Sequence, residues 1–166
     1  MSETRNEVDE IIDRNLFRQD VYELVPAGTE RILDFGCNEG ELLLRLRRDK
    51  GCKEIYGIDV IDRVRPILDR HLDGGWVRDL HHWDLDPKYQ RFFNYVLMHD
   101  VVEHLYDPWF VMAKLRNCLA PGGKLVVVVP NFRYWHFWSQ IILGEFRYGA
   151  PGGLMNEEHI RWFTLA

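Results

Sequence analysis

Residues 31–40, Arg-Ile-Leu-Asp-Phe-Gly-Cys-Asn-Glu-Gly, constrain the fold of this chain more than any other segment. A short apolar run ends at Asp34, glycines follow at Gly36 and Gly40, and Glu41-Leu-Leu-Leu-Arg-Leu begins an amphipathic pattern. This order predicts a buried strand, a tight turn and a helix start. Such a turn lets the backbone press closely against a nucleotide-like ligand.

The turn differs from the dinucleotide fingerprint G-x-G-x-x-G, which would need glycines where Asn38 and Glu41 stand. Glu39 and Glu41 also place negative charge at the turn and the first helical residue, where it would repel a pyrophosphate. A ligand with an adenosine end, a cationic centre and no phosphate fits better. S-adenosylmethionine (SAM) is the common molecule of that description.

A second strand pattern, Lys53-Glu-Ile-Tyr-Gly-Ile-Asp, ends in another acid, Asp59. An acid at the tip of the second parallel strand is placed to accept hydrogen bonds from both ribose hydroxyls. Either Asp34 or Asp59 alone would be read as an ordinary turn residue. Two acids, each closing an apolar strand and bracketing one helix, together predict a nucleoside site.

Five segments in the same order resemble the class I SAM-dependent methyltransferases, and the resemblance runs from about residue 15 to the end. They are the glycine turn 32–40, the ribose acid in 56–59, an adenine segment at 83–86, a strand and turn over 93–108, and a turn and strand over 119–131. The tail 153–164 is similar to bacterial members of the type 11 and 12 groups that are linked to methylation of cell-surface glycans or small metabolites.

The resemblance implies a set of cofactor contacts spread over four turns. They are Asp34, Gly36, Cys37, Asn38 and Gly40; Asp59 and Val60; Asp84 and Leu85; and Met98, His99 and Asp100 for the methionine part. Asn38 replaces a glycine that is usual in the family. Because asparagine tolerates a left-handed backbone, we expect the turn to survive.

The expected fold class is α/β: a Rossmann-like, doubly wound, mostly parallel sheet with helices on both faces, lacking the usual C-terminal β-hairpin. Apolar runs predict strands near 31–35, 54–59, 76–83, 93–98 and 124–129. The run Leu125-Val-Val-Val-Val129 lacks alternation, as expected of a strand covered on both faces. In the family order 3-2-1-4-5 this fifth strand would keep an open edge, which predicts a homodimer or a swapped contact through that edge unless residues 132–150 fold back as a cover.

The 166 residues predict a single SAM-methyltransferase domain. It divides into a helical lead-in (1–28), a cofactor-binding core (29–131) and an aromatic-rich segment (132–166) that we expect to form the acceptor pocket or lid. A net charge of −5 offers no footprint for nucleic acid, and no apolar run suggests a stable membrane anchor. Cys37, Cys52 and Cys118 have no paired spacing, which predicts reduced thiols and a cytoplasmic location.

The expected reaction is methyl transfer from SAM to a hydroxyl of a small molecule or glycan. If the acceptor needs a general base, His104 and His159 are the candidates. A second hypothesis is a SAM-binding module without turnover.

A third hypothesis begins from Asp100-Val-Val-Glu-His104 and the downstream His159, which are similar to the metal ligands of the small-RNA 3′-terminal 2′-O-methyltransferases. The acidic net charge and the missing basic surface weigh against an RNA acceptor. Motif matches of this kind also occur in metal-free relatives, so no metal is expected.

Overall fold

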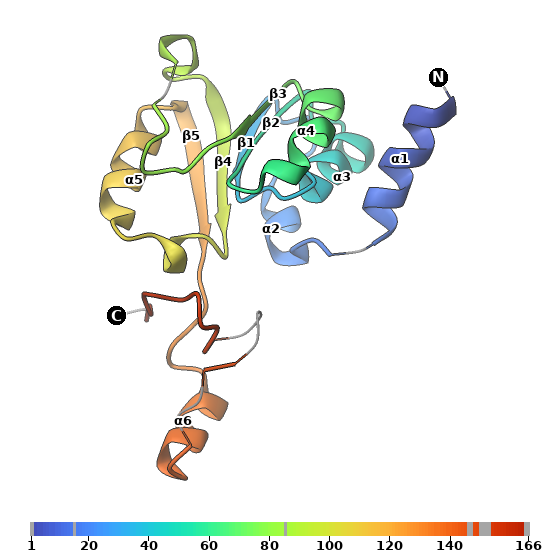
Figure 1. Ribbon diagram of the computed structural model, residues 1–166. Helices are drawn as coiled ribbons and strands as arrows, with labels where there is room; N and C mark the ends of the chain where they lie inside the picture. The colour runs from blue at the N-terminus through green and yellow to red at the C-terminus, as the bar shows by residue number, and fades with distance from the viewer. Residues whose placement is uncertain (1, 15, 85, 146–147, 150–153, 165–166) are drawn as a thin grey trace.

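The computed structural model describes residues 2–14, 16–84, 86–145, 148–149 and 154–164. Its centre is a five-stranded sheet in the order β3-β2-β1-β4-β5, in which every neighbouring pair is parallel (Figure 1). The strands are β1 (Arg31–Phe35), β2 (Glu54–Asp59), β3 (Gly74–Val77), β4 (Phe93–His99) and β5 (Leu119–Val128). The predicted α/β class and strand order are confirmed.

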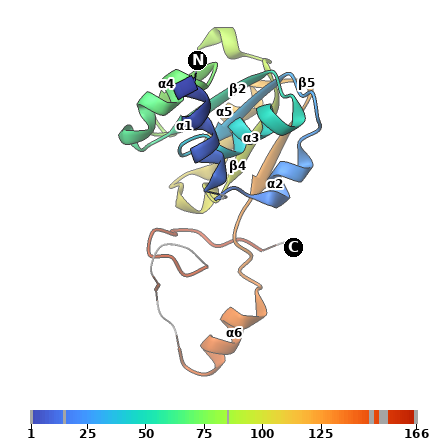
Figure 2. The same ribbon diagram turned by 90° about the vertical axis from the view of Figure 1, so that its right-hand side faces the viewer.

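Helices cover both faces of the sheet. On one face lie α1 (Ser2–Asp13), α2 (Gln19–Leu24), α3 (Glu41–Lys50) and α4 (Arg65–His71), and α5 (Pro108–Arg116) lies on the other (Figures 1 and 2). Successive side chains along a strand point to opposite faces of the sheet, so the strands contribute to two cores. Ile32 packs in the core on the α1–α4 side, whereas Leu33 packs in the core on the α5 side. Three short 3₁₀ turns complete the connections, η1 (Asp62–Val64), η2 (Pro87–Tyr89) and η3 (Val102–His104).

The start of α5 follows from its sequence. The Asp107 carboxylate accepts a hydrogen bond from the Phe110 backbone N–H at 3.0 Å, and Pro108 occupies the first helical position. This is the expected N-cap and first-turn proline arrangement.

Two strands differ from their predicted bounds. β3 covers Gly74–Val77 instead of the region near 76–83, because Gly75 lets α4 approach: a Cβ there would lie 2.5 Å from the Leu68 Cβ. β5 begins at Leu119, so Gly122 and Gly123, which were expected in the turn before the strand, lie within it. The pairing of β4 with β5 is irregular between Phe93 and Tyr95, and this irregularity accommodates the two glycines.

β5 is an edge strand of the described sheet, and both of its faces are covered in part: Val126 and Val128 pack against the α1–α4 core, and Leu119 and Leu125 pack against the α5 core. Its residues are partly exposed, and Val127 keeps 39% of its surface accessible. The unbroken apolar run therefore corresponds to a strand with apolar contacts on both faces, neither of which is fully buried.

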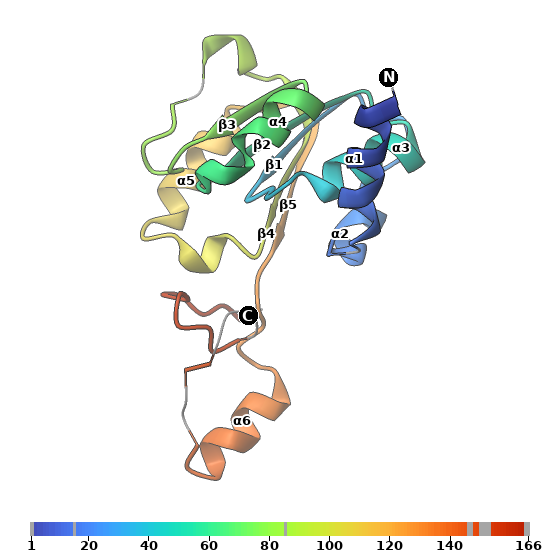
Figure 3. The same ribbon diagram turned by 45° about the vertical axis from the view of Figure 1, so that its right-hand side comes forward.

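Beyond β5 the chain leaves the sheet, forms α6 (Trp135–Ile142) and returns to the carboxyl end of the strands (Figures 1 and 3). Asn131 bridges Phe163, and the Glu103 carbonyl of η3 accepts the Ile160 N–H at 3.0 Å and the Arg161 N–H at 3.2 Å. These bonds fix the returning segment beside η3. No helix in the described ranges has the length and apolar character that a membrane crossing requires.

Candidate functional site

The glycine turn between β1 and α3 is built from three residues with positive φ. Gly36 has φ +71°, Asn38 has φ +50° and Gly40, the N-cap of α3, has φ +78°. Asn38 thus adopts the left-handed conformation expected of it. Gly36 is also required by space, since a Cβ there would lie 2.6 Å from a methyl carbon of Val101.

Asp59 joins the end of β2 to this turn. One carboxylate oxygen accepts the Asn38 N–H at 2.7 Å, and the other accepts the Ile61 N–H at 2.9 Å. The residue is 7% exposed and lines a hollow of about 550 Å³ at the carboxyl ends of the strands. This hollow, here called the adenosyl cleft, is lined by Gly36, Ile58, Asp59, Val60, Ile61, Arg78, Asp79, Leu80, His81, Asp100, Val101, His104, Leu105, Tyr106 and Glu158.

A second hollow of about 250 Å³ adjoins the cleft at Gly36 and is here called the lead-in hollow. Its lining is Ile11, Arg14, Leu16, Phe17, Asp34, Gly36, Cys37, Asn38, Glu39, Glu41, Leu42, Arg63 and His99. The lead-in is tied down here, since Arg14 pairs with Glu39 and the Leu16 N–H donates to the Glu41 carboxylate at 3.0 Å. The two turn acids are therefore engaged by the lead-in while still lining the hollow.

A buried acid and an imidazole face each other in the lead-in hollow. Asp34 is fully buried, and one of its carboxylate oxygens lies 3.4 Å from Nε2 of His99. Burial alone would lower the pKa of His99, but the Asp34 charge and hydrogen bond outweigh it, so that pKa is raised. Burial, reinforced by Asp34 and Asp59, raises the pKa of Cys37, which keeps its thiol protonated at neutral pH.

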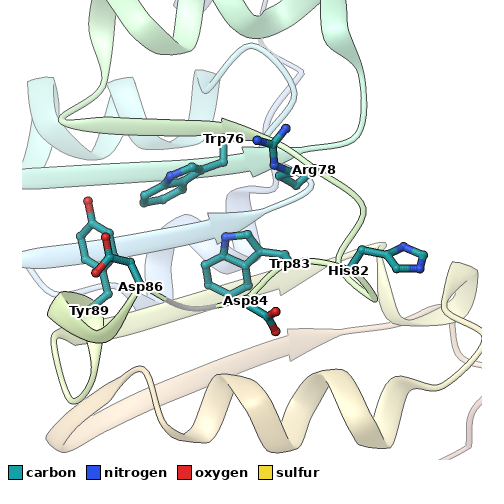
Figure 4. A pocket seen from close by; sticks show the side chains of 7 residues that line it. All are labelled: Trp76, Arg78, His82, Trp83, Asp84, Asp86 and Tyr89. Atoms are coloured by element: carbon teal, nitrogen blue, oxygen red, sulfur yellow. The ribbon is translucent and has the colours of Figure 1, made fainter.

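The predicted adenine segment is placed elsewhere. Asp84 is exposed, pairs with Lys114 at 3.1 Å and lines a separate small hollow with Trp76 and Trp83 (Figure 4). Figure 4 shows its carboxylate pointing away from the Trp76 ring. Because β3 ends at Val77, the loop that enters the adenosyl cleft carries Asp79 and Leu80 instead.

Of three other predicted contacts, one falls outside the described residues and two line neither hollow. Leu85 falls outside the described residues. Met98 is fully buried in the core cluster on the α5 side, and Gly40 supports the turn from the start of α3. Neither Met98 nor Gly40 is among the residues that line the adenosyl cleft or the lead-in hollow.

A third hollow, of about 580 Å³, lies beneath the returning tail and is here called the tail hollow. It is lined by Arg18, Asp100, Glu103, His104, Val129, Pro130, Asn131, Leu154, Asn156 and His159. Asp100 and His104 also line the adenosyl cleft, so the two spaces adjoin. Asp100 and His104 therefore form a wall that the tail hollow and the adenosyl cleft have in common.

The structure brings the two predicted base candidates together in the tail hollow. The rings of His104 and His159 are 4.8 Å apart between centroids, and Nε2 of His159 lies 3.9 Å from a carboxylate oxygen of Glu103. Burial raises the pKa of Glu103. Asp100, in contrast, has φ +54° and bonds the Arg18 guanidinium at 2.5 Å.

Several lining residues escaped sequence reasoning. Asp79 and Leu80 lie two and three residues after Val77, the last residue of β3, so a correct strand end would have revealed them. Arg14, Phe17 and Arg18 of the lead-in carry no motif, because their place depends on contacts with residues far along the chain.

Parallel strands in the order 3-2-1-4-5, a glycine turn and an acid-tipped second strand define a class I SAM-dependent methyltransferase. A family model described as a methyltransferase domain matches residues 2–166, and the chain belongs to that family. The predicted resemblance is confirmed, and SAM is the cofactor of the family.

Curated relatives are similar over the core of the chain. The tRNA U34 carboxymethyltransferase of Methylococcus capsulatus is 32% identical over 67% of this chain and 39% of its own length. The ubiquinone biosynthesis O-methyltransferase of Cereibacter sphaeroides is 32% identical over 78% of this chain and 53% of its own. The chain thus spans about half the length of such relatives, or less.

A solved SAM-dependent methyltransferase from Archaeoglobus fulgidus shares the fold. It superimposes with a TM-score of 0.62 over 95% of this chain and 63% of its own, at 16% identity. This likeness supports the architecture described above.

Proposed function

We propose that this chain transfers the methyl group of SAM to a hydroxyl of a small molecule or glycan. The observation that carries the proposal is the joining of Asp59 to the glycine turn at the mouth of the adenosyl cleft. Such a cradle offers carboxylate acceptors to ribose hydroxyls.

The cofactor is proposed to lie across the two adjoining hollows. Asp59 and Val60 would meet the ribose, while Asp79 and Leu80 would meet the adenine. The methionine end would lie in the lead-in hollow, where Asp34 and Glu39 are suited to its ammonium group. Gly36, which lines both spaces, would stand between them.

The transfer itself needs alignment and exclusion of water more than it needs a strong catalyst. A lone pair of the acceptor oxygen forms the bond to the methyl carbon, and the carbon–sulfur bond breaks with its electrons staying on sulfur. The products are the methylated acceptor, a released proton and S-adenosylhomocysteine. His104 and His159 are the side chains placed to act on the acceptor hydroxyl, because they face the tail hollow.

Relatives of this chain carry names that give different acceptors, so the acceptor of this chain does not follow from the family alone. The net charge of −5 favours a small or glycan acceptor over RNA. The aromatic segment 132–166, including the exposed Trp135, supports an acceptor-side role for the part of the chain beyond β5.

Calorimetry with SAM, S-adenosylhomocysteine and NADH tests the cofactor, and an acceptor panel followed by mass spectrometry tests the reaction. We expect both sulfur compounds to bind and NADH to fail, with a mass gain of one methyl on a hydroxylated acceptor. SAM binding without any methylated product would favour the non-catalytic binding module. Binding of NADH instead of SAM would overturn the assignment.

A further inference from the structure

Three side chains with metal-ligating atoms converge in the tail hollow from two distant parts of the chain. Glu103 and His104 come from η3, and His159 comes from the returning tail. One ligand atom from each lies within 4.8 Å of the other two. Two imidazole nitrogens and one carboxylate oxygen form a donor set that suits divalent first-row transition metals better than calcium or magnesium.

Both imidazoles are oriented by their own backbone contacts. Nδ1 of His104 lies 3.1 Å from the Glu158 carbonyl, and Nδ1 of His159 lies 3.1 Å from the Leu154 carbonyl. A carbonyl oxygen only accepts, so Nδ1 must be the protonated nitrogen in each ring. Each Nε2 is then left with its lone pair, which is how metal-binding histidines are commonly held.

Glu103 gives a second and independent indication. The residue is 1% exposed, and among the described residues neither carboxylate oxygen has a hydrogen-bond partner. A buried carboxylate without a partner is unfavourable, and it is found where a cation or a proton compensates it. Asp100 does not share this situation, because Arg18 already neutralises it.

The backbone holds the third ligand in place. The Glu103 carbonyl accepts the Ile160 and Arg161 N–H groups, and the Arg161 side chain donates to the Leu105 carbonyl at 3.0 Å. His159 is therefore fixed next to Glu103 by bonds that do not involve the ligand atoms themselves. The adjoining tail hollow provides an entry path for an ion.

We propose that Glu103, His104 and His159 bind a divalent transition metal ion, such as Zn²⁺ or Mn²⁺, at the border between the tail hollow and the adenosyl cleft. Metal bonds of about 2.0–2.2 Å put neighbouring ligand atoms roughly 3 Å apart. Small side-chain rotations would bring the three atoms to that spacing. With three protein ligands, positions remain open for water or an acceptor oxygen.

This site would refine the proposed function, on which this step of the inference rests. A bound ion would hold the acceptor hydroxyl and make its proton more acidic, and the proton would pass to solvent as the oxygen attacks the methyl group. His104 and His159 would then act as ligands and not as free bases. Metal binding itself needs neither SAM nor an acceptor, so it can be tested separately.

The test uses tag-free protein stripped with EDTA, because a histidine tag would bind the same ions. Zn²⁺ is titrated by calorimetry and Co²⁺ by visible absorption, both without SAM. We expect one ion per chain, Co²⁺ bands of nitrogen and oxygen ligation, and a raised melting temperature with metal. Glu103→Gln and His159→Asn should each weaken binding at least tenfold, whereas His82→Asn, altering an exposed histidine outside the cluster, should leave it unchanged.

A folding control accompanies these variants. Metal-free Glu103→Gln should melt no lower than the metal-free wild type, because it removes an uncompensated buried charge. Equal binding by wild type and Glu103→Gln would overturn the proposal, as would a thiolate-to-cobalt band that places the ion on a cysteine.

Failure of metal binding and failure of methyl transfer can be told apart. Specific binding without methylation would uphold the metal site and count against the proposed function. Methylation at an unchanged rate after complete chelation would overturn the acceptor-activating role of the ion.

Discussion

The Asp59 carboxylate accepts the backbone N–H of Asn38 at 2.7 Å and so ties the end of β2 to the turn that follows β1. The same carboxylate accepts the Ile61 N–H and lines the adenosyl cleft. One side chain therefore stabilises the turn and, in the proposed function, also meets the ribose. These two roles can be separated by experiment.

Asp59→Ala should weaken SAM binding and also lower the free energy of unfolding. Loss of hydrogen bonds to a charged group corresponds to about 1.5–3 kcal/mol on either quantity. Calorimetry and urea unfolding measure the two effects. Asp84→Asn is the matched control, because that acid lies in the separate hollow and should change neither quantity. An unchanged SAM affinity in a folded Asp59→Ala protein would contradict the ribose assignment.

Gly36→Ala should destabilise the fold more than Gly28→Ala. Both glycines have positive φ, +71° and +72°, and both substitutions carry a left-handed penalty of about 1–2 kcal/mol. Only at Gly36 does the new Cβ meet a neighbour, the Val101 methyl at 2.6 Å. Urea unfolding of both variants isolates the contact, and adding Val101→Ala should recover part of the difference. Equal losses of unfolding free energy at both positions would show that the Val101 side chain moves aside without cost, and would contradict the prediction.

Stability should depend on pH through His99. Its pKa is raised by Asp34, and to a smaller extent by Asp100, against the opposing effects of burial and Arg18. A raised folded-state pKa gives stability that is complete below the unfolded value, about 6.5, and is lost as pH rises through the folded value. Wild type should lose stability relative to His99→Gln as pH rises above about 6.5. Urea unfolding across this range measures it, and NMR of the ring resonances should give His99 a higher pKa than in Asp34→Asn.

The edge of β5 should pair with a second copy of the chain. In the described sheet β5 bonds only β4, and its partly exposed apolar face includes Val127. Open apolar edges recruit partners, and charges along them oppose pairing. Light scattering should show a dimer for the wild type and a monomer for Val127→Glu. A monomeric wild type at high concentration would exclude this edge as the interface.

Prediction from sequence succeeded where the signal is local. β1 and β2 fall at the predicted 31–35 and 54–59, because each is an apolar run closed by a turn. β3 was misplaced because Gly74 and Gly75 resemble a breaker, while here Gly75 allows α4 to pack against the strand and Gly74 leaves room for the Tyr56 ring. Because of that error the expected contact was Asp84, which lines the separate hollow, and not Asp79, which lines the adenosyl cleft.

The acceptor side shows where local reasoning ends. His104 and His159 were both expected to matter, but their contact depends on hydrogen bonds between residues more than 50 positions apart, which composition and periodicity do not encode. The buried, unpartnered state of Glu103 is likewise visible only in the folded chain.

The returning tail is held to η3 and the residues after it by several bonds: the Glu103 carbonyl accepts two tail N–H groups, the His104 ring contacts the Glu158 carbonyl, and Arg161 donates to the Leu105 carbonyl. Residues 135–142 of α6 make none of these bonds and line neither the adenosyl cleft nor the lead-in hollow. An engineer could therefore replace α6 by a foreign segment to redirect the choice of acceptor, while Glu158 stays in the adenosyl cleft and donor recognition is left as it is.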